Sequence, residues 1–335
     1  MLTEKQTERM LDKLKQFEET LENLMFRPVE EVSMGMYQTS ESLDRMPDRE
    51  LFHKAKKGDI WGGEGKYCWF AGDFVVPEYL DGKDLYLKPE IGGYEAMLWI
   101  DGVPYGIYTS KIIVHSHGNH YCNLMKKKAE VGEHVDIALE YYAHHYVMGT
   151  QPFSCNPHEK YEYSYNKVSV CLKDQEISDF YFDLKIVNQM TDVLDKNSFR
   201  RADIINTLYQ IHQIIYYDYE NAGHAEFMEA LRKAEPLLCN ILSKKNSETT
   251  PFAGLIGHSH MDTAWLWHQG ETLKKCARTY SNQMNLMDQY PNYTFIQSSA
   301  YHGALMKEHY PELFEQMKNR IAEGRYEPNG GAWIE

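Results

Sequence analysis

The sequence predicts a multidomain α+β protein, because the spacing of its apolar residues changes repeatedly along the chain. Residues 1 to about 27 have the period of an amphipathic helix, and residues 67–175 contain short β-type runs separated by turns. Residues 176 to about 243 return to a helical period, and strand-type and helix-type segments alternate after Pro251. The chain is therefore divided into four segments: 1–66, 67–175, 176–250 and 251–335.

An amphipathic helix is expected at the N-terminus. Its apolar residues recur at intervals of three and four positions: Met10, Leu14, Phe17, Leu21 and Leu24. Pro28 marks the expected end of this helix. Packing within its own chain is the simpler interpretation of the apolar face, although so long a helix also permits a homo-oligomer.

Residues 67–175 predict a β-sandwich. The β-type runs are Tyr67–Phe70, Asp84–Leu87, Ala96–Ile100 and Val135–Leu139. Turn signals separate them, and Asp101-Gly102 is the dipeptide of a two-residue hairpin. Short strands with such turns favour a sandwich. Residues 95–102 also resemble the jelly-roll modules that accompany many glycosidases, which is a likeness of scaffold and not of site.

The second half of the chain predicts three helices and then a parallel sheet. The helices are expected at 176–194, 199–217 and 223–242, and a polar linker follows at 244–250. After Pro251 the order is strand, helix, strand, helix, strand, expected at 252–257, 272–287, 293–297, 305–322 and 332–334. Such alternation is typical of parallel sheets, and further strands would be needed to cover the edge of this one.

Composition excludes several classes of protein. The net charge of −14 disfavours a nucleic-acid partner, because an acidic surface repels phosphates. No run of eighteen apolar residues is present, so neither a transmembrane helix nor a membrane partner is expected. The N-terminus does not have the layout of a signal peptide. The six scattered cysteines are then expected to be free thiols and the location cytoplasmic.

The segment that carries candidate chemistry is Gly257-His258-Ser259-His260-Met261-Asp262-Thr263-Ala264-Trp265-Leu266-Trp267. It begins where the first parallel strand should end, which is where active sites of barrels and open α/β sheets gather. If extended geometry continues, His258, His260 and Asp262 point to one side. Imidazole and carboxylate together suit zinc, and the tryptophans could form a stacking wall for a sugar.

Other histidine pairs are weaker signals. His115-Ser116-His117 lies in the sandwich region without a carboxylate at the matching spacing, so a solvated loop or hairpin is the better interpretation. His144-His145 is interpreted as structural.

The segment 260–267 resembles the signature of the family 38 glycoside hydrolases, which are α-mannosidases, and the layout before Pro251 resembles that of their cytosolic and vacuolar branch. The likeness is dense over about 84 residues. It continues through residues 271–281, 290–291, 295–300, 307–314 and 330–335. The region before Pro251 is similar only in its layout of helix, sandwich and helices.

This resemblance implies that residues 251–335 begin a (β/α)7 barrel with one Zn²⁺ ion per active site. By position, His260 and Asp262 correspond to the first two zinc ligands, and Trp265 to the wall of the sugar subsite. His258 corresponds to no ligand and is expected to be a packing or outer-sphere residue. Family members release terminal α-linked mannose from oligosaccharides by a retaining double displacement, with the metal on the 2- and 3-hydroxyls of the sugar.

The sequence departs from the family pattern in one respect. The family nucleophile lies in a segment like Asp-x-Phe-Gly, and neither Asp73-Phe74 nor Asp179-Phe180 fits it. The nucleophile, the acid/base residue and the last two zinc ligands would follow Glu335, so no catalytic residue is assigned here. The 335 residues alone are therefore expected to be inactive.

Two alternatives remain at this point. One is another metal-dependent carbohydrate hydrolase, such as a deacetylase, in which zinc activates water directly. The other is a non-catalytic carbohydrate-binding protein, for which the sandwich would be the binding module. The sequence leaves open the preferred mannosidic linkage and the physiological glycan.

Overall fold

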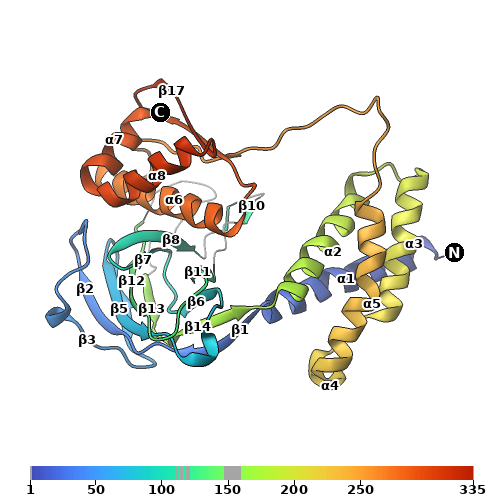
Figure 1. Ribbon diagram of the computed structural model, residues 1–335, viewed down its shortest axis with the longest axis horizontal. Coiled ribbons are helices and arrows are strands. Elements are labelled where there is room, and N and C mark those ends of the chain that lie inside the picture. The colour runs from blue at the N-terminus through green and yellow to red at the C-terminus, as the bar shows by residue number, and fades with distance from the viewer. Residues whose placement is uncertain (1, 110–111, 114–115, 118–120, 147–159, 335) are drawn as a thin grey trace. The chain divides into compact units, whose positions relative to one another are not determined.

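A computed structural model describes residues 2–109, 112–113, 116–117, 121–146 and 160–334 (Figure 1). It confirms a mixed α+β protein, with eight α-helices and mainly antiparallel sheets among the described residues. Two compact units each combine segments that are distant along the chain: residues 1–27 join 173–253, and residues 28–172 join 254–335. Of the described helices, none is both long and apolar enough to cross a membrane.

The first unit is a helical bundle. Its elements are α1 (Glu4–Leu24), α2 (Gln175–Val193), α3 (Phe199–Ile214), the short α4 (Tyr219–Ala222) and α5 (His224–Leu242). Side-chain caps fix where the helices begin: Thr3 forms a capping box with Gln6, and Asp174 and Ser198 cap α2 and α3. The predicted helices at 1–27, 176–194, 199–217 and 223–242 are confirmed to within a few residues.

The second unit contains two antiparallel sheets packed face to face, which confirms the predicted sandwich. One sheet has the order β1-β14-β6-β11. Its strands are β1 (Phe26–Glu31), β14 (Lys167–Lys173), β6 (Leu85–Glu90) and β11 (Asn123–Lys126). The other sheet has the order β3-β2-β5-β12-β7-β8. Its strands are β3 (His53–Lys54), β2 (Gly35–Thr39), β5 (Tyr67–Val75), β12 (His134–Tyr142), β7 (Glu95–Ile100) and β8 (Val103–Thr109).

Two small antiparallel ladders complete the described strands of this region. They are β4 (Ile60–Gly62) with β13 (Glu162–Ser164), and β9 (Ile112–Ile113) with β10 (Ser116–His117). The predicted hairpin between β7 and β8 is confirmed. Asp101 and Gly102 both have positive φ, 51° and 80°, as a type I′ turn requires.

The six-stranded sheet is covered on both faces. Its inner face joins the sandwich core through Phe70, Leu98 and Leu139. Its outer face packs Trp69 and Trp99 against a second core that includes residues of α6 (Gln269–Gln289). Burial on both faces explains why β5 and β7 are almost continuously apolar instead of alternating.

The C-terminal segment of this unit is a three-stranded parallel sheet with helical crossovers. Its strands are β15 (Gly257–His258), β16 (Phe295–Ser299) and β17 (Tyr326–Ala332), and α7 (Ala300–His309) and α8 (Pro311–Ala322) connect the last two. The parallel βαβαβ order is confirmed, and its continuation into a closed barrel stays an expectation.

Three predicted bounds in this segment are wrong. The expected buried strand at 252–257 is exposed coil except at its end, with Phe252 and Leu255 103% and 94% exposed. Among the described strands β15 has β16 as its one neighbour, so nothing covers the preceding apolar run.

The expected helix at 305–322 is two helices, because Pro311 starts α8 and supplies no backbone N–H to continue α7. The last strand begins at Tyr326, opposite Phe295, and ends at Ala332 instead of spanning 332–334.

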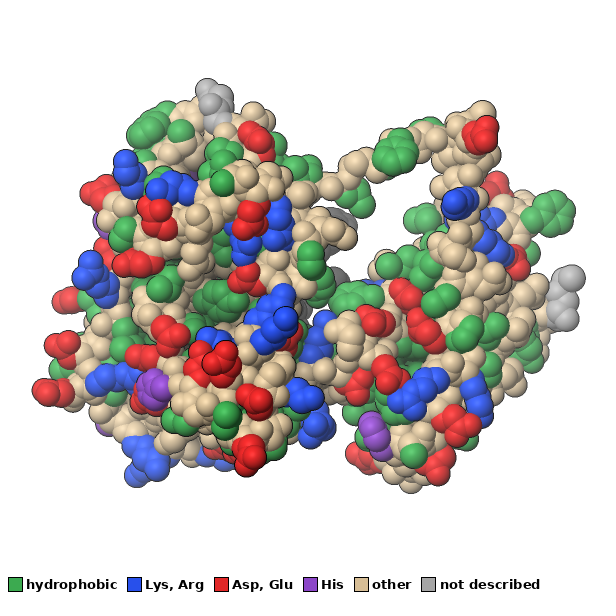
Figure 2. Space-filling view, in the orientation of Figure 1, with side chains coloured by type: hydrophobic (Ala, Val, Ile, Leu, Met, Phe, Trp, Pro, Cys, Tyr) green, Lys and Arg blue, Asp and Glu red, His purple; other side chains and the backbone are tan. Residues whose placement is uncertain are grey.

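On the face shown in Figure 2, acidic and basic side chains are interspersed over each unit. This distribution is typical of solvated surface. The described cysteines are free thiols: Cys68, Cys122, Cys171, Cys239 and Cys276. Cys155 lies outside the described residues.

Candidate functional site

The predicted ligand pair lies directly after the edge strand β15. The Met261 side chain is buried and its sulfur lies 3.9 Å from Sγ of Cys276 on α6. Its two neighbours in sequence therefore point outward, with the side chains of His260 and Asp262 65% and 36% exposed. Nε2 of His260 lies 3.5 Å from Oδ1 of Asp262. His258 lies in β15 and is exposed.

The spacing of this pair suits a shared zinc ion. Two donors bound tetrahedrally at about 2.1 Å from one ion are about 3.4 Å apart. An imidazole nitrogen and a carboxylate oxygen also have the chemistry that zinc takes. A tetrahedral zinc ion takes four ligands, and this pair supplies two. Within the part of the chain that the structure describes, no third His, Cys, Asp or Glu atom joins the pair.

Trp265 follows the pair on the same loop. Its side chain is 55% exposed, and its ring meets that of Trp267 edge to face at 5.8 Å. Trp267 is fixed instead: its Nε1 donates to Oγ1 of Thr272 at 3.1 Å, and Nζ of Lys275 lies 4.8 Å above its ring. Of the two tryptophans, Trp265 is therefore the one whose face a ligand can reach.

The loop between β15 and α6 is held at several points. The Thr272 hydroxyl donates to the Thr263 carbonyl, and the Thr263 hydroxyl lies 3.1 Å from Nε2 of the buried His302. At the far end, Nδ1 of His268 accepts from the Glu271 amide at 3.3 Å and caps α6. These contacts predict a preorganised loop.

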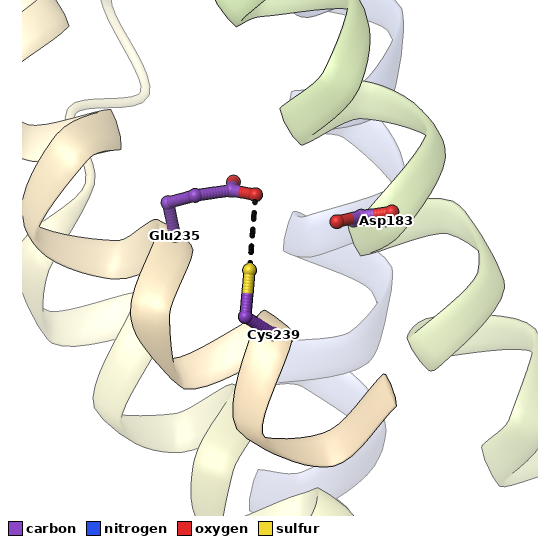
Figure 3. A group of neighbouring side chains, drawn as sticks. All are labelled: Asp183, Glu235 and Cys239. Atoms are coloured by element: carbon purple, nitrogen blue, oxygen red, sulfur yellow. Dashed lines mark hydrogen bonds between the residues drawn. The ribbon is translucent and has the colours of Figure 1, made fainter. Parts of the chain in front are cut away.

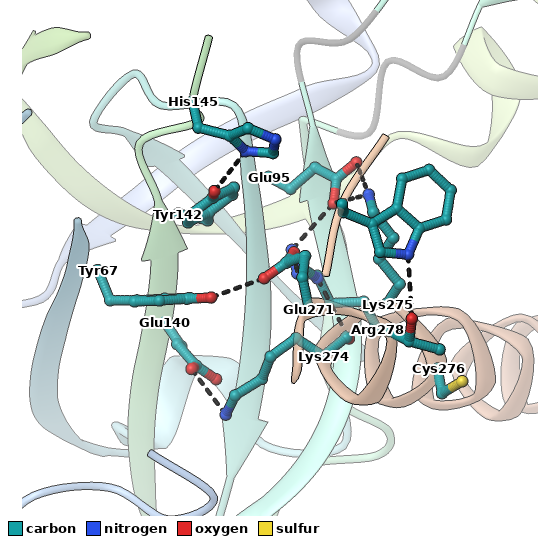
Figure 4. A network of polar contacts seen from close by, with 12 residues as sticks. Tyr67, Glu95, Glu140, Tyr142, His145, Glu271, Lys274, Lys275, Cys276 and Arg278 are labelled. Carbon is teal, nitrogen blue, oxygen red and sulfur yellow. Dashed lines mark hydrogen bonds and ion pairs between the residues drawn. The ribbon is translucent and has the colours of Figure 1, made fainter. Parts of the chain in front are cut away.

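A buried charge network attaches α6 to the six-stranded sheet (Figure 4). Arg278 bonds Glu95 of β7 at 2.9 Å and also Glu271 in the first turn of α6. Lys274 pairs with Glu140 of β12 at 2.9 Å. The hydroxyl of Tyr67 on β5 donates to Glu271 at 2.6 Å. Each buried charge therefore has an opposite partner, as desolvation demands.

The pKa shifts follow from this arrangement. Burial raises the pKa of Glu140, and the Lys274 ammonium offsets part of that shift. Burial alone would lower the pKa of Arg278, but the carboxylates of Glu271 and Glu95 raise it above its usual value. Burial, and then the nearby Glu271, raise the pKa of Tyr67. Arg278 therefore stays charged, and Tyr67 stays a donor, across the physiological range.

A second group of potential ligands lies in the helical bundle (Figure 3). Asp183 of α2 and Glu235 and Cys239 of α5 have donor atoms within 4.8 Å of one another. Sγ of Cys239 lies 3.5 Å from the Glu235 carboxylate. Burial is the main cause that raises the pKa of both carboxyls, and Asp179 raises both further. Asp183 also raises the pKa of Glu235, whereas the hydrogen bond with Glu235 lowers that of Asp183. Burial and the proximity of the carboxyl groups explain the raised pKa values in this group of residues without a bound metal ion.

The remaining histidine predictions have different outcomes. His115 lies outside the described residues, and His117 lies in β10. His144 has a left-handed backbone and stacks on Tyr94 at 3.8 Å. His145 reaches the candidate site, because its Nε2 lies 3.0 Å from the Leu266 carbonyl oxygen. Sequence reasoning missed this contact, since no local pattern links residues 121 positions apart.

Comparison with known proteins shows a similarity over the segment that contains this loop. Residues 253–335 match the description "Glycosyl hydrolases family 38 N-terminal domain". The chain is related to the α-mannosidases of that family. The predicted resemblance is thereby confirmed, and the matched segment contains His260, Asp262 and Trp265.

Two α-mannosidase relatives match most of the chain, including the region before the loop. Alpha-mannosidase 2C1 of Mus musculus is 26% identical over 308 residues, which is 91% of this chain and 28% of the mouse protein. Alpha-mannosidase G of Dictyostelium discoideum is 26% identical over 85% of this chain and 25% of its own. The Saccharomyces cerevisiae alpha-mannosidase is 40% identical over 81 residues. The chain thus spans about a quarter of the length of the longer-matching relatives.

A solved structure that aligns with this chain is much less similar to it. A β-glucuronidase of Ruminococcus gnavus aligns with 44% of this chain and 28% of its own, with a TM-score of 0.29 and 10% identity. A likeness at that level carries no argument about fold or function.

Proposed function

We propose that the protein to which these residues belong hydrolyses terminal α-linked mannose of oligosaccharides, by a retaining and zinc-dependent double displacement. The observation that carries the proposal is the 3.5 Å approach of His260 and Asp262, beside an exposed Trp265, inside the family-matched segment. A cytoplasmic location and an oligomannose substrate are parts of the same proposal.

Each of these residues has a role that its surroundings support. His260 and Asp262 would hold one zinc ion, which when bound supplies a Lewis-acid centre for sugar hydroxyls. The buried Met261 between them keeps both side chains directed to solvent, from which a sugar arrives. Trp265 would stack on the C–H face of the sugar and orient it.

The two displacements require a carboxylate nucleophile and a carboxylic acid/base about 5–5.5 Å apart. We assign neither role within these 335 residues. The proposed contribution of this chain is to bind and orient the sugar, and the covalent steps belong to residues of the remaining barrel.

The test uses the full-length polypeptide and two variants, His260→Ala and Asp262→Asn. We expect each variant to lose at least tenfold in zinc affinity, measured by chelator competition, because one of the ion's four ligands is removed. Aryl α-mannoside hydrolysis should fall in parallel, and nuclear magnetic resonance should show the α-anomer of mannose as the first product. His258→Asn serves as the matched control and should keep both properties.

Three outcomes would redirect the assignment. Release of acetate from an acetylated glycan, without release of mannose, would favour the deacetylase alternative. Sugar binding that survives His260→Ala, in a protein without turnover, would favour a non-catalytic binding protein. Unchanged zinc affinity in both variants would show that His260 and Asp262 are not zinc ligands.

A further inference from the structure

A histidine of the sandwich bridges to the loop that carries the candidate site. His145 follows the end of β12 by three residues, and its Nε2 lies 3.0 Å from the carbonyl oxygen of Leu266. Leu266 directly follows Trp265. Nδ1 of the same ring lies 2.7 Å from the hydroxyl of Tyr142, the last residue of β12 (Figure 4). One imidazole thus joins the sheet to the wall of the proposed sugar subsite.

The chemistry of the two partners fixes the tautomer of this ring. A carbonyl oxygen only accepts, so Nε2 of His145 must carry the proton and donate to Leu266. Nδ1 of the neutral ring is then an acceptor, and the Tyr142 hydroxyl donates to it. Burial raises the pKa of Tyr142, which keeps its hydroxyl a donor.

Tyr142 is itself held in place by the charge network. Its ring lies 4.9 Å from the ring of Tyr67, whose hydroxyl donates to Glu271 in the first turn of α6. The contacts therefore form a closed path from the loop at Leu266, through His145, Tyr142 and Tyr67, back to the helix in which the loop ends. A shift of Leu266 would strain several of these contacts at once.

We propose that His145 is a positioning residue that holds Trp265 in the orientation needed to stack on the sugar. The sugar named in this inference rests on the proposed function, whereas the contact between His145 and the loop does not depend on it. The Leu266 carbonyl is a backbone anchor directly adjacent to the exposed Trp265, in addition to the hydrogen bond from the Trp265 amide to the Trp267 carbonyl at 3.3 Å.

The test compares variants of the full-length protein. His145→Phe keeps a ring of similar size and removes the hydrogen bonds to Leu266 and Tyr142, whereas His145→Gln keeps an N–H donor near the position of Nε2. His134→Phe is the matched control, since it changes an exposed histidine at the other end of β12. Hydrogen exchange of a peptide covering residues 263–268 reports on the loop, and KM and kcat with an aryl α-mannoside report on its use.

In His145→Phe we expect loop amides to exchange about tenfold faster, since one hydrogen bond is worth about that factor. KM should rise about tenfold while kcat stays within threefold, as for a lost contact made equally in ground and transition states. His145→Gln should recover both within threefold, which a packing role alone would not produce. His134→Phe should change neither.

The inference is overturned if loop exchange in His145→Phe equals that of the wild type, or if the Gln variant is as impaired as the Phe variant. If the wild-type protein hydrolyses no mannoside, the proposed function fails, and the exchange comparison still decides whether His145 holds the loop. If His145→Phe does not fold, Tyr142→Phe removes only the hydroxyl that orients the imidazole. Loop exchange in that variant should rise about threefold, and an unchanged rate there also overturns the inference.

Discussion

Arg278 is the residue on which the interface between α6 and the six-stranded sheet most depends. It is buried and binds two carboxylates from different elements, Glu95 and Glu271. Its removal takes the guanidinium from both buried carboxylates, and Glu95 keeps its pair with Lys275 at 3.3 Å. Breaking a buried ion pair by deleting one partner costs about 3–5 kcal/mol. We expect Arg278→Met to destabilise the second unit by about that amount in urea unfolding followed by tryptophan fluorescence.

An exposed ion pair provides the control for Arg278. Lys318 and Glu315 pair on the surface of α8, with side chains 49% and 63% exposed. Such pairs contribute about 0–1 kcal/mol, so Lys318→Met should leave the unfolding midpoint nearly unchanged. Equal effects of the two substitutions would show that charge burial does not dominate at Arg278.

Single residues also show where prediction from sequence reached its limit. The alternation at His260, Met261 and Asp262 is local, so the outward ligand pair could be predicted from five residues of extended chain. The roles of Glu95 and His145 depend on contacts 183 and 121 positions away. Nothing in the local pattern of either residue differs from that of an ordinary polar side chain at the end of a strand.

Among the elements, α2 and α5 carry a pH-dependent contact. The pKa values of Asp183 and Glu235 are both raised, mainly by burial. A carboxyl group whose pKa is raised in the folded state contributes fully to stability below its unfolded-state pKa. This contribution to the free energy of unfolding is lost as the pH rises through the folded-state pKa. We therefore expect the bundle to lose stability from this pair as pH rises above about 4.5.

The variant Glu235→Gln should remove that loss. Its unfolding midpoint in urea, read from exchange of α5 peptides, should exceed that of the wild type at pH 7, and the difference should shrink toward pH 4. Glu229→Gln on the same helix is the control. Because Lys233 lowers the pKa of Glu229, the change in unfolding midpoint at pH 7 should have the opposite sign. A midpoint for Glu235→Gln below that of the wild type at pH 7 would contradict the assignment.

A helix or hairpin could be predicted where its own residues determine its structure. Apolar spacing predicted α1, α2, α3 and α5, and Asp101-Gly102 predicted a hairpin. The apolar run at 252–256 was assigned to a buried strand because its composition suits one. Whether such a run is buried depends on neighbouring strands, and β16 alone does not cover it.

At the scale of the whole molecule, the chain contains the sugar-orienting part of the proposed site without an assigned nucleophile. Two ligands hold zinc weakly compared with four. We expect the purified 335-residue polypeptide to release no mannose from an aryl α-mannoside above a zinc-free blank. Zinc-dependent turnover by this polypeptide would contradict the expectation and place the nucleophile within it. The full-length protein, assayed in parallel, is the positive control.

The second unit is discontinuous along the chain, because residues 173–253 form the other unit between its two parts. During synthesis the sheet face with Trp69 and Trp99 and the carboxylate of Glu140 therefore emerge long before α6 can cover them. At about 5–20 residues per second, the wait from Glu140 to Lys274 is roughly 7–27 seconds. For that period the nascent chain carries an uncovered aromatic sheet face with unneutralised acid groups, and we expect ribosome-associated chaperones to bind it. Release of this unit from them should coincide with the appearance of α6.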